Sequence, residues 1–235
     1  MPKLLVMSNV VLACQRRVDM EGNGTISPAE WKSLISEQYG QIYSIAIQSG
    51  MRFRESTQTI TADGSASYEL YGDHEETVGV ERVTDSAGRT VMLDELMIQE
   101  RGVFSGSTGT ACAYSIVGSS VVLMPRPTTG TYVLTYVPQA PDLTQFGDSD
   151  TIDVFTGNGE AALTWGVAVK ACAKTRNDPG LAIAERDAAL QRFSNDAMMR
   201  AAQNPRRRVV MRSQLIDGYS DDCGLLIDEA SWRWR

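Results

Sequence analysis

The spacing of apolar residues changes twice along this chain, and these two changes limit the folds open to it. Up to about residue 50, apolar residues recur every three or four positions, which predicts amphipathic helices. From residue 51 to about 140 they alternate in short runs between turn-forming residues, which predicts short strands. The helical spacing returns after Gly159 and stops at Pro205. The pattern predicts an α+β fold: a helical bundle of about four helices with an inserted small antiparallel β domain and an extended C-terminal arm.

These changes divide the chain into four segments. They are a helical hairpin (1–50), a β-rich insert (51–156), a helical pair that completes the bundle (157–204) and the extended arm (205–235). The first helix is expected over residues 4–18. Within the insert, the clearest predicted hairpin joins residues 120–124 to residues 132–137.

The start of the second helix has two interpretations. Ser27, Pro28 and Glu30 match a capping box with proline in the first turn, and this interpretation needs no ion. The same stretch also resembles an EF-hand calcium loop, whose ligands would be Asp19, Glu21, Asn23, Thr25, Ser27 and Glu30. We favour the capping box and expect no metal and no cofactor. A calcium-binding EF-hand-like interaction module is the alternative function.

Cysteine and histidine usage disfavours zinc and nucleophilic chemistry. The four cysteines are far apart in the sequence and never form a CxxC pair, which is typical of reduced thiols. The single histidine, His74, lies in an acidic run and is expected to be a solvated loop residue. An enzyme using carboxylates of the insert is the remaining catalytic alternative, with Asp73, Glu75, Glu76 and Asp94 as candidates. Their spacing singles out no acid and base pair, so we expect no enzyme.

The charge distribution disfavours a protein that grips DNA. The net charge is −7, and residues 51–156 contain fifteen acidic and six basic residues. Binding to the outside of DNA requires clustered cations that neutralise phosphates. DNA is therefore expected only as passing cargo.

The C-terminal arm is a candidate docking segment. It contains two tryptophans and a group of arginines, residue types that dominate interface hot spots. The candidate docking residues are Arg206, Arg207, Arg208, Arg212, Trp232 and Trp234.

Three stretches in order give the chain a family resemblance. They are residues 23–31 with the helix that follows, the β stretch over residues 116–138, and Gly157-Asn158-Gly159-Glu160 opening a helix. Together they resemble the head-to-tail adaptor proteins of tailed bacteriophages, over most of residues 10–208.

This resemblance implies a structural, non-enzymatic protein of the virion, located at the head–tail junction and in the host cytoplasm during assembly. It implies a ring of about twelve copies below the portal that extends the DNA channel. The implied partners are other copies of the chain, the portal protein and a downstream tail or neck protein, with no membrane. The C-terminal arm would clamp the portal.

Overall fold

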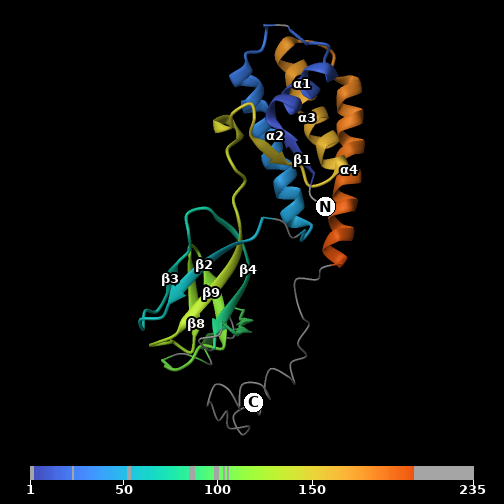
Figure 1. Ribbon diagram of the computed structural model, residues 1–235. Helices are drawn as coiled ribbons and strands as arrows, with labels where there is room; N and C mark the ends of the chain where they lie inside the picture. The colour runs from blue at the N-terminus through green and yellow to red at the C-terminus, as the bar shows by residue number, and fades with distance from the viewer. Residues whose placement is uncertain are drawn as a thin grey trace. The chain divides into compact units, whose positions relative to one another are not determined.

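The computed structural model describes residues 3–22, 24–51, 54–84, 88–97, 101–102, 104 and 106–203. These residues divide into two compact units (Figure 1). One unit, called the helical unit below, contains the described residues up to 51 and those from 140 onward. The other, called the β unit, contains residues 54–139.

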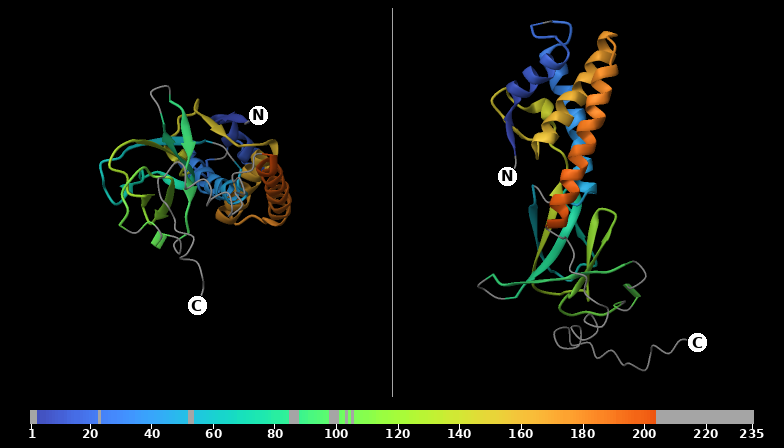
Figure 2. Two further views of the ribbon diagram at one scale, coloured as in Figure 1. Left: turned by 90° about the horizontal axis from the view of Figure 1, so that it is seen from below. Right: turned by 90° about the vertical axis from the view of Figure 1, so that its right-hand side faces the viewer.

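The helical unit is built around its third helix. Its helices are α1 (Met7–Arg17), α2 (Pro28–Gln48), α3 (Gly157–Thr175) and α4 (Gly180–Gln203). Helix α3 contacts each of the other three, and two further views show α4 running beside it (Figure 2). The unit also contains a short ribbon of two strands, β1 (Leu4–Val6) and β10 (Thr151–Asp153), and a 3-10 turn, η2 (Leu143–Gln145). None of the helices in the described residues combines the length and the apolar character that a membrane crossing requires.

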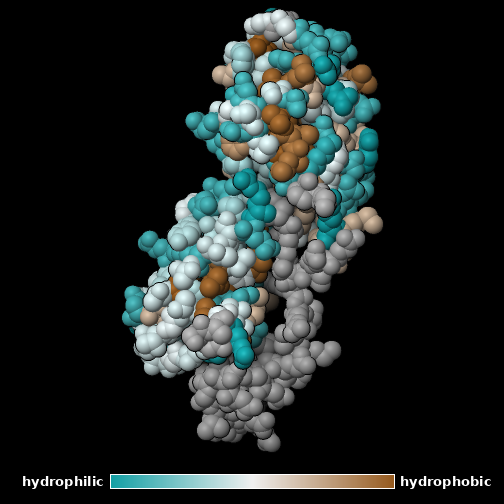
Figure 3. All heavy atoms as spheres, viewed as in Figure 1, coloured by the Kyte–Doolittle hydropathy of each residue, from teal (hydrophilic) through white to brown (hydrophobic). Residues whose placement is uncertain are grey.

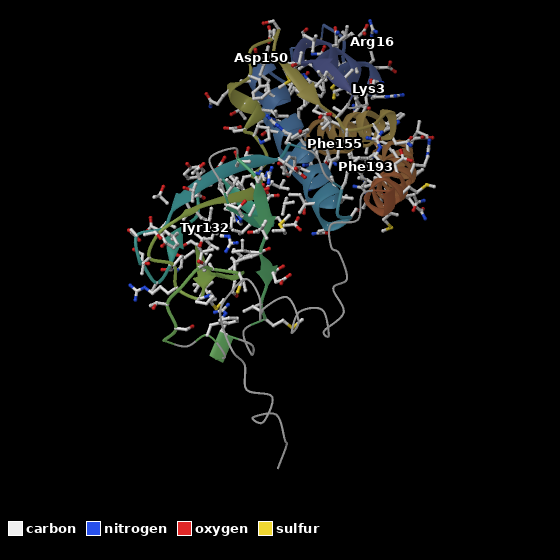
Figure 4. The ribbon with its side chains drawn as sticks, turned by 60° about the horizontal axis from the view of Figure 1, so that its bottom comes forward. Lys3, Arg16, Tyr132, Asp150, Phe155 and Phe193 are labelled. Atoms are coloured by element: carbon white, nitrogen blue, oxygen red, sulfur yellow. The ribbon has the colours of Figure 1, made fainter. Side chains whose placement is uncertain are left out.

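An aromatic cluster forms the centre of the helical unit. Phe155, between β10 and α3, stacks on Tyr39 of α2, with ring centroids 5.8 Å apart. It also contacts Tyr43, and Phe193 of α4 at 5.9 Å (Figure 4). Each of these four side chains is at most 2% exposed. Burial of large rings from three parts of the chain stabilises the packing of the helices.

The β unit contains two four-stranded sheets. The first has the order β2-β9-β4-β5, and the second β3-β8-β7-β6. Pairing is antiparallel except between β6 and β7, which are parallel. The strands are β2 (Ser56–Thr61), β3 (Tyr68–Glu69), β4 (His74–Val83), β5 (Thr90–Met92), β6 (Asp94–Glu95), β7 (Ala113–Val117), β8 (Ser120–Met124) and β9 (Thr131–Pro138). Inward-facing residues of both sheets share one core, which includes Tyr132 and Leu134 at 0% exposure.

The two sheets are joined along both sides. On one side a single segment passes from one sheet to the other, because the Leu93 N–H donates to Val80 of β4 and the Asp94 N–H donates to Cys112, which precedes β7. On the other side the buried side chain of Gln58 in β2 bridges to the β3 segment. Its amide donates to the Glu69 carbonyl (2.7 Å), and its oxygen accepts from the Tyr71 N–H (3.2 Å). The β unit is therefore closed like a barrel, with a side-chain amide replacing one backbone ladder.

The expected fold class is wrong in how it distributes the strands. The described residues contain four helices and ten strands in three sheets, and the strands are not confined to an insert. Residues 4–6, expected in the first helix, form β1, which pairs with β10 inside the helical unit. The β unit is not a small antiparallel sheet but two joined sheets with a parallel pair. The expected C-terminal arm lies outside the described residues.

The predicted hairpin between residues 120–124 and 132–137 is also wrong. These segments form β8 and β9, which belong to different sheets. The connection between them bonds to other loops instead of turning tightly, since the Arg126 N–H donates to Ser107 and the Pro127 carbonyl accepts from Gly64. The hairpin forms one step earlier, where Gly118 adopts a φ of 58° and β7 turns directly into β8.

Candidate functional site

The turn between α1 and α2, the candidate calcium loop, is organised as a helix start. The Glu30 N–H donates to Ser27 Oγ (3.3 Å), and the Ser27 N–H donates to the Glu30 carboxylate (2.8 Å). Pro28 occupies the first helical position. The predicted capping box is therefore confirmed.

The same residues are not arranged to hold a cation. The Glu21 carboxylate pairs with Arg16, and the Glu30 carboxylate pairs with Lys174 of α3. The Lys174 ammonium and the hydrogen bonds from Ser27 lower the pKa of Glu30 to about 2. A hollow beside the turn is lined by Arg16, Asp19 and Glu21, so a cation there would meet a guanidinium.

Calcium needs six to eight oxygen ligands around one point. Within the described ranges, no group of three or more His, Cys, Asp or Glu side chains gathers as a metal site would require. The candidate ligand Asn23 lies outside the described residues. The calcium alternative thus has no support.

His74 is not a solvated loop residue, so that expectation is wrong. It is the first residue of β4, where its ring stacks on Tyr136 with centroids 5.4 Å apart, and its Nε2 lies 2.9 Å from Thr77 Oγ1. Partial burial lowers its pKa, although the neighbouring carboxylates act in the opposite direction. His74 lies close to Tyr136 because β4 pairs with β9. The residues around His74 in the sequence do not indicate this contact.

The candidate carboxylates of the insert do not form a catalytic pair. Asp73 accepts a hydrogen bond from the Tyr136 hydroxyl (3.1 Å), and its backbone carbonyl accepts from the Gln139 N–H (2.6 Å). Glu75 and Glu76 lie in β4, whereas Asp94 lies in β6, in the other sheet. Asp73 therefore has a structural use, fixing the end of β9 at the point where the chain leaves the β unit.

The start of α3 is closely packed against the backbone before it and against α4. The Gly159 N–H donates to Thr156 Oγ1 (3.0 Å), which caps the helix. A Cβ on Gly159 would lie 2.1 Å from the Val154 carbonyl oxygen, whereas a Cβ on Gly157 would meet nothing within 4 Å. Asn158 donates to Asp196 of α4 (2.7 Å). The second glycine is thus required for close approach to the protein's own backbone.

A second close approach lies between α2 and α3. A Cβ on Gly166 would lie 2.2 Å from Gln38 Cδ, and Gln38 is 1% exposed. The Gln38 amide nitrogen and the Trp31 indole nitrogen are both buried and have no hydrogen-bond partner within the part of the chain that the structure describes. The sequence analysis did not identify this contact. A glycine in mid-helix, directly after Trp165, is the signal that could have found it.

The described cysteines are packing residues. Cys14, Cys112 and Cys172 are free, and burial raises the pKa of the Cys14 thiol to about 12. A thiol in this state is a poor nucleophile at neutral pH. The candidate docking residues Arg206, Arg207, Arg208, Arg212, Trp232 and Trp234 lie outside the described residues.

Comparison with known proteins gives one family. The model of the SU10 adaptor protein family matches residues 17–214, which include α2 to α4 and the whole β unit. No curated protein matches the chain. The match supports the coarser part of the resemblance, a structural adaptor protein of a bacteriophage.

Proposed function

The chain belongs to the SU10 adaptor protein family, and on this premise we propose that it is the head-to-tail adaptor of a tailed phage virion. In this proposal, copies of the chain form a ring of about twelve below the portal. The ring extends the DNA channel and links the capsid to a downstream tail or neck protein. The observation that carries the proposal is the family match over residues 17–214.

The arrangement of the described residues supports a structural role. Their conspicuous polar side chains have structural uses: Glu30 caps a helix, Asp73 fixes the end of β9, and Gln58 closes the β unit. A closed ring requires one surface of a protomer to bind a different surface of the next.

The C-terminal arm is the proposed portal-docking element. Trp232 and Trp234 would supply buried aromatic anchors, and Arg206, Arg207, Arg208 and Arg212 would bind carboxylates. An arm that becomes ordered on binding can wrap a large surface, which suits a permanent joint.

The charge of the chain supports DNA as passing cargo. With a net charge of −7, the protein repels phosphates more than it attracts them. Such a surface would let DNA slide past without sticking.

The proposal is tested by the absolute mass of the purified chain, alone and mixed with the portal protein of the same phage. Native mass spectrometry or light scattering should show a ring-sized complex on the portal. A chain that stays monomeric and does not bind the portal would contradict the adaptor assignment.

A further inference from the structure

The contact surface between α2 and α3, called the seam below, buries a polar side chain over a glycine. On the face of the helical unit shown in Figure 3, hydrophilic side chains lie at the surface, where water reaches them. Gln38 differs from these, because it is 1% exposed. Its amide lies directly over Gly166, where an added Cβ would overlap Gln38 Nε2. Any hydrogen bond of this amide must therefore be made inside the seam.

The seam contains buried nitrogen donors that lack a partner. Among the described residues, Gln38 Nε2, Lys170 Nζ and the Trp31 indole nitrogen have no hydrogen-bond partner. Trp31 and Gln38 are seven positions apart on α2, which places both on the face that packs against α3. A buried donor without a partner destabilises the folded state, and in native proteins such groups usually bond to an ordered water.

Lys170 and Glu37 lie beside the buried amide. Lys170 follows Gly166 by four positions on α3, so the two positions are neighbours on one face of that helix. Lys170 Nζ lies 2.8 Å from Glu37 Oε1, and the angle between the groups gives an ion pair but no hydrogen bond. The Lys170 side chain is 20% exposed and that of Glu37 is 64% exposed. Solvent therefore reaches this part of the seam from the Glu37 side.

We propose that an ordered water molecule binds at this point of the seam, between Gln38, Lys170 and Glu37. It accepts hydrogen bonds from Gln38 Nε2 and Lys170 Nζ and donates one to the Glu37 carboxylate. Three hydrogen bonds are typical of a buried water. The site belongs to a single copy of the chain, so it does not depend on the proposed ring.

The charge of the site favours water over an anion. Two nitrogen donors alone would also suit a chloride ion or a phosphate oxygen. Here the Lys170 ammonium is balanced by the Glu37 carboxylate 2.8 Å away, so the pair has no net charge. The carboxylate would repel an anion, whereas a water can donate to it.

A high-resolution crystal structure of the full chain tests the site directly. We expect density for a water about 2.7–3.2 Å from Gln38 Nε2 and from Lys170 Nζ. Absence of this density would overturn the proposal. So would a Gln38 amide that is turned over, with its oxygen bonded directly to Lys170 Nζ. Crystals soaked in bromide test the ion, because an anomalous signal at this position would show an anion in place of the water.

Urea unfolding of Gln38→Met gives an independent test. Methionine keeps the length of the side chain and removes its donors, so the water loses a partner. The equilibrium constant of unfolding should rise about fivefold. Gln41→Met, at an exposed glutamine of the same helix, is the matched control and should change this constant less than about twofold.

The direction of the Gln38→Met effect separates the two explanations of the buried amide. If the Gln38 donors have no partner in solution, removing them stabilises the protein, and a variant more stable than the wild type would overturn the proposal. Equal stability of Gln38→Met and Gln41→Met would do the same. Neither result bears on the adaptor function, which is tested by the mass of the portal complex.

Discussion

At the scale of single residues, the fold depends on two glycines whose missing side chains make room for a neighbour. Gly159 lies against the Val154 carbonyl, and Gly166 lies against Gln38. Gly157 is in open space, although it belongs to the same short motif as Gly159. The sequence shows these three glycines in one helix, but only the packing shows which of them are required.

Gly166→Ala should destabilise the protein by about 1–3 kcal/mol, because the added methyl group overlaps the buried Gln38 side chain. Urea unfolding followed by circular dichroism measures the change. Gly157→Ala is the control and should be neutral or slightly stabilising. Adding Gln38→Ala to Gly166→Ala should recover much of the loss. A Gly166→Ala variant as stable as Gly157→Ala would contradict the close packing of α2 against α3.

Gln58→Leu should cost about 1–2 kcal/mol of unfolding free energy, because two part-buried hydrogen bonds to the backbone of the β3 segment are lost. Thermal unfolding measures the loss, and Thr59→Val, at an exposed position of the same strand, is the control. If both variants unfold at the same temperature, the Gln58 amide does not hold the two sheets together.

At the scale of elements, the sequence predicts best where local chemistry decides the structure. Ser27, Pro28 and Glu30 fix the start of α2 by contacts within four residues, and the capping box follows from them. By contrast, β1 was expected to be helical, because three residues are too few to show a strand period and Leu4 fits a helical stripe. The partner of β8 was missed for a related reason. Strand pairing depends on distant segments, and both β8 and β9 look like hairpin strands on their own.

The cap of α2 should make stability depend on pH. The pKa of Glu30 is lowered from 4.5 to about 2, so its stabilising effect is complete above pH 4.5 and is lost as the pH falls toward 2. Glu30→Gln should lower the melting temperature at pH 7, and the gap to the wild type should narrow below pH 4.5. Melting curves at half-unit steps from pH 2 to 7 measure it.

Lys174→Gln is the companion variant, because it removes the ion-pair partner and leaves the capping box intact. It should reproduce only part of the Glu30→Gln effect. If the difference in melting temperature between Glu30→Gln and the wild type stays constant from pH 7 to pH 2, the ionised carboxylate does not have the role given to it here.

At the scale of the whole molecule, the proposed function separates a folded body from an interacting arm. Deletion of residues 206–235 should leave a folded protein, since the aromatic cluster of the helical unit and the shared core of the β unit are both built from residues before 204. The truncated chain should no longer bind the portal, as measured by co-sedimentation. Trp232→Ala with Trp234→Ala keeps the length of the arm and should weaken portal binding through lost anchors. Unfolding of the truncated chain, or undiminished binding, would contradict the proposed arm.

The connections between the two units have a mechanical consequence. The chain enters the β unit just before Ser56 and leaves it just after Pro138, and Ser56 pairs with Tyr136 near the same end of the β2–β9 ladder. A pull transmitted through both connections draws these two neighbouring strands in the same direction. The load then does not slide one strand past the other, and the hydrogen bonds between them are not sheared. The β unit would therefore move as one body when both connections are pulled.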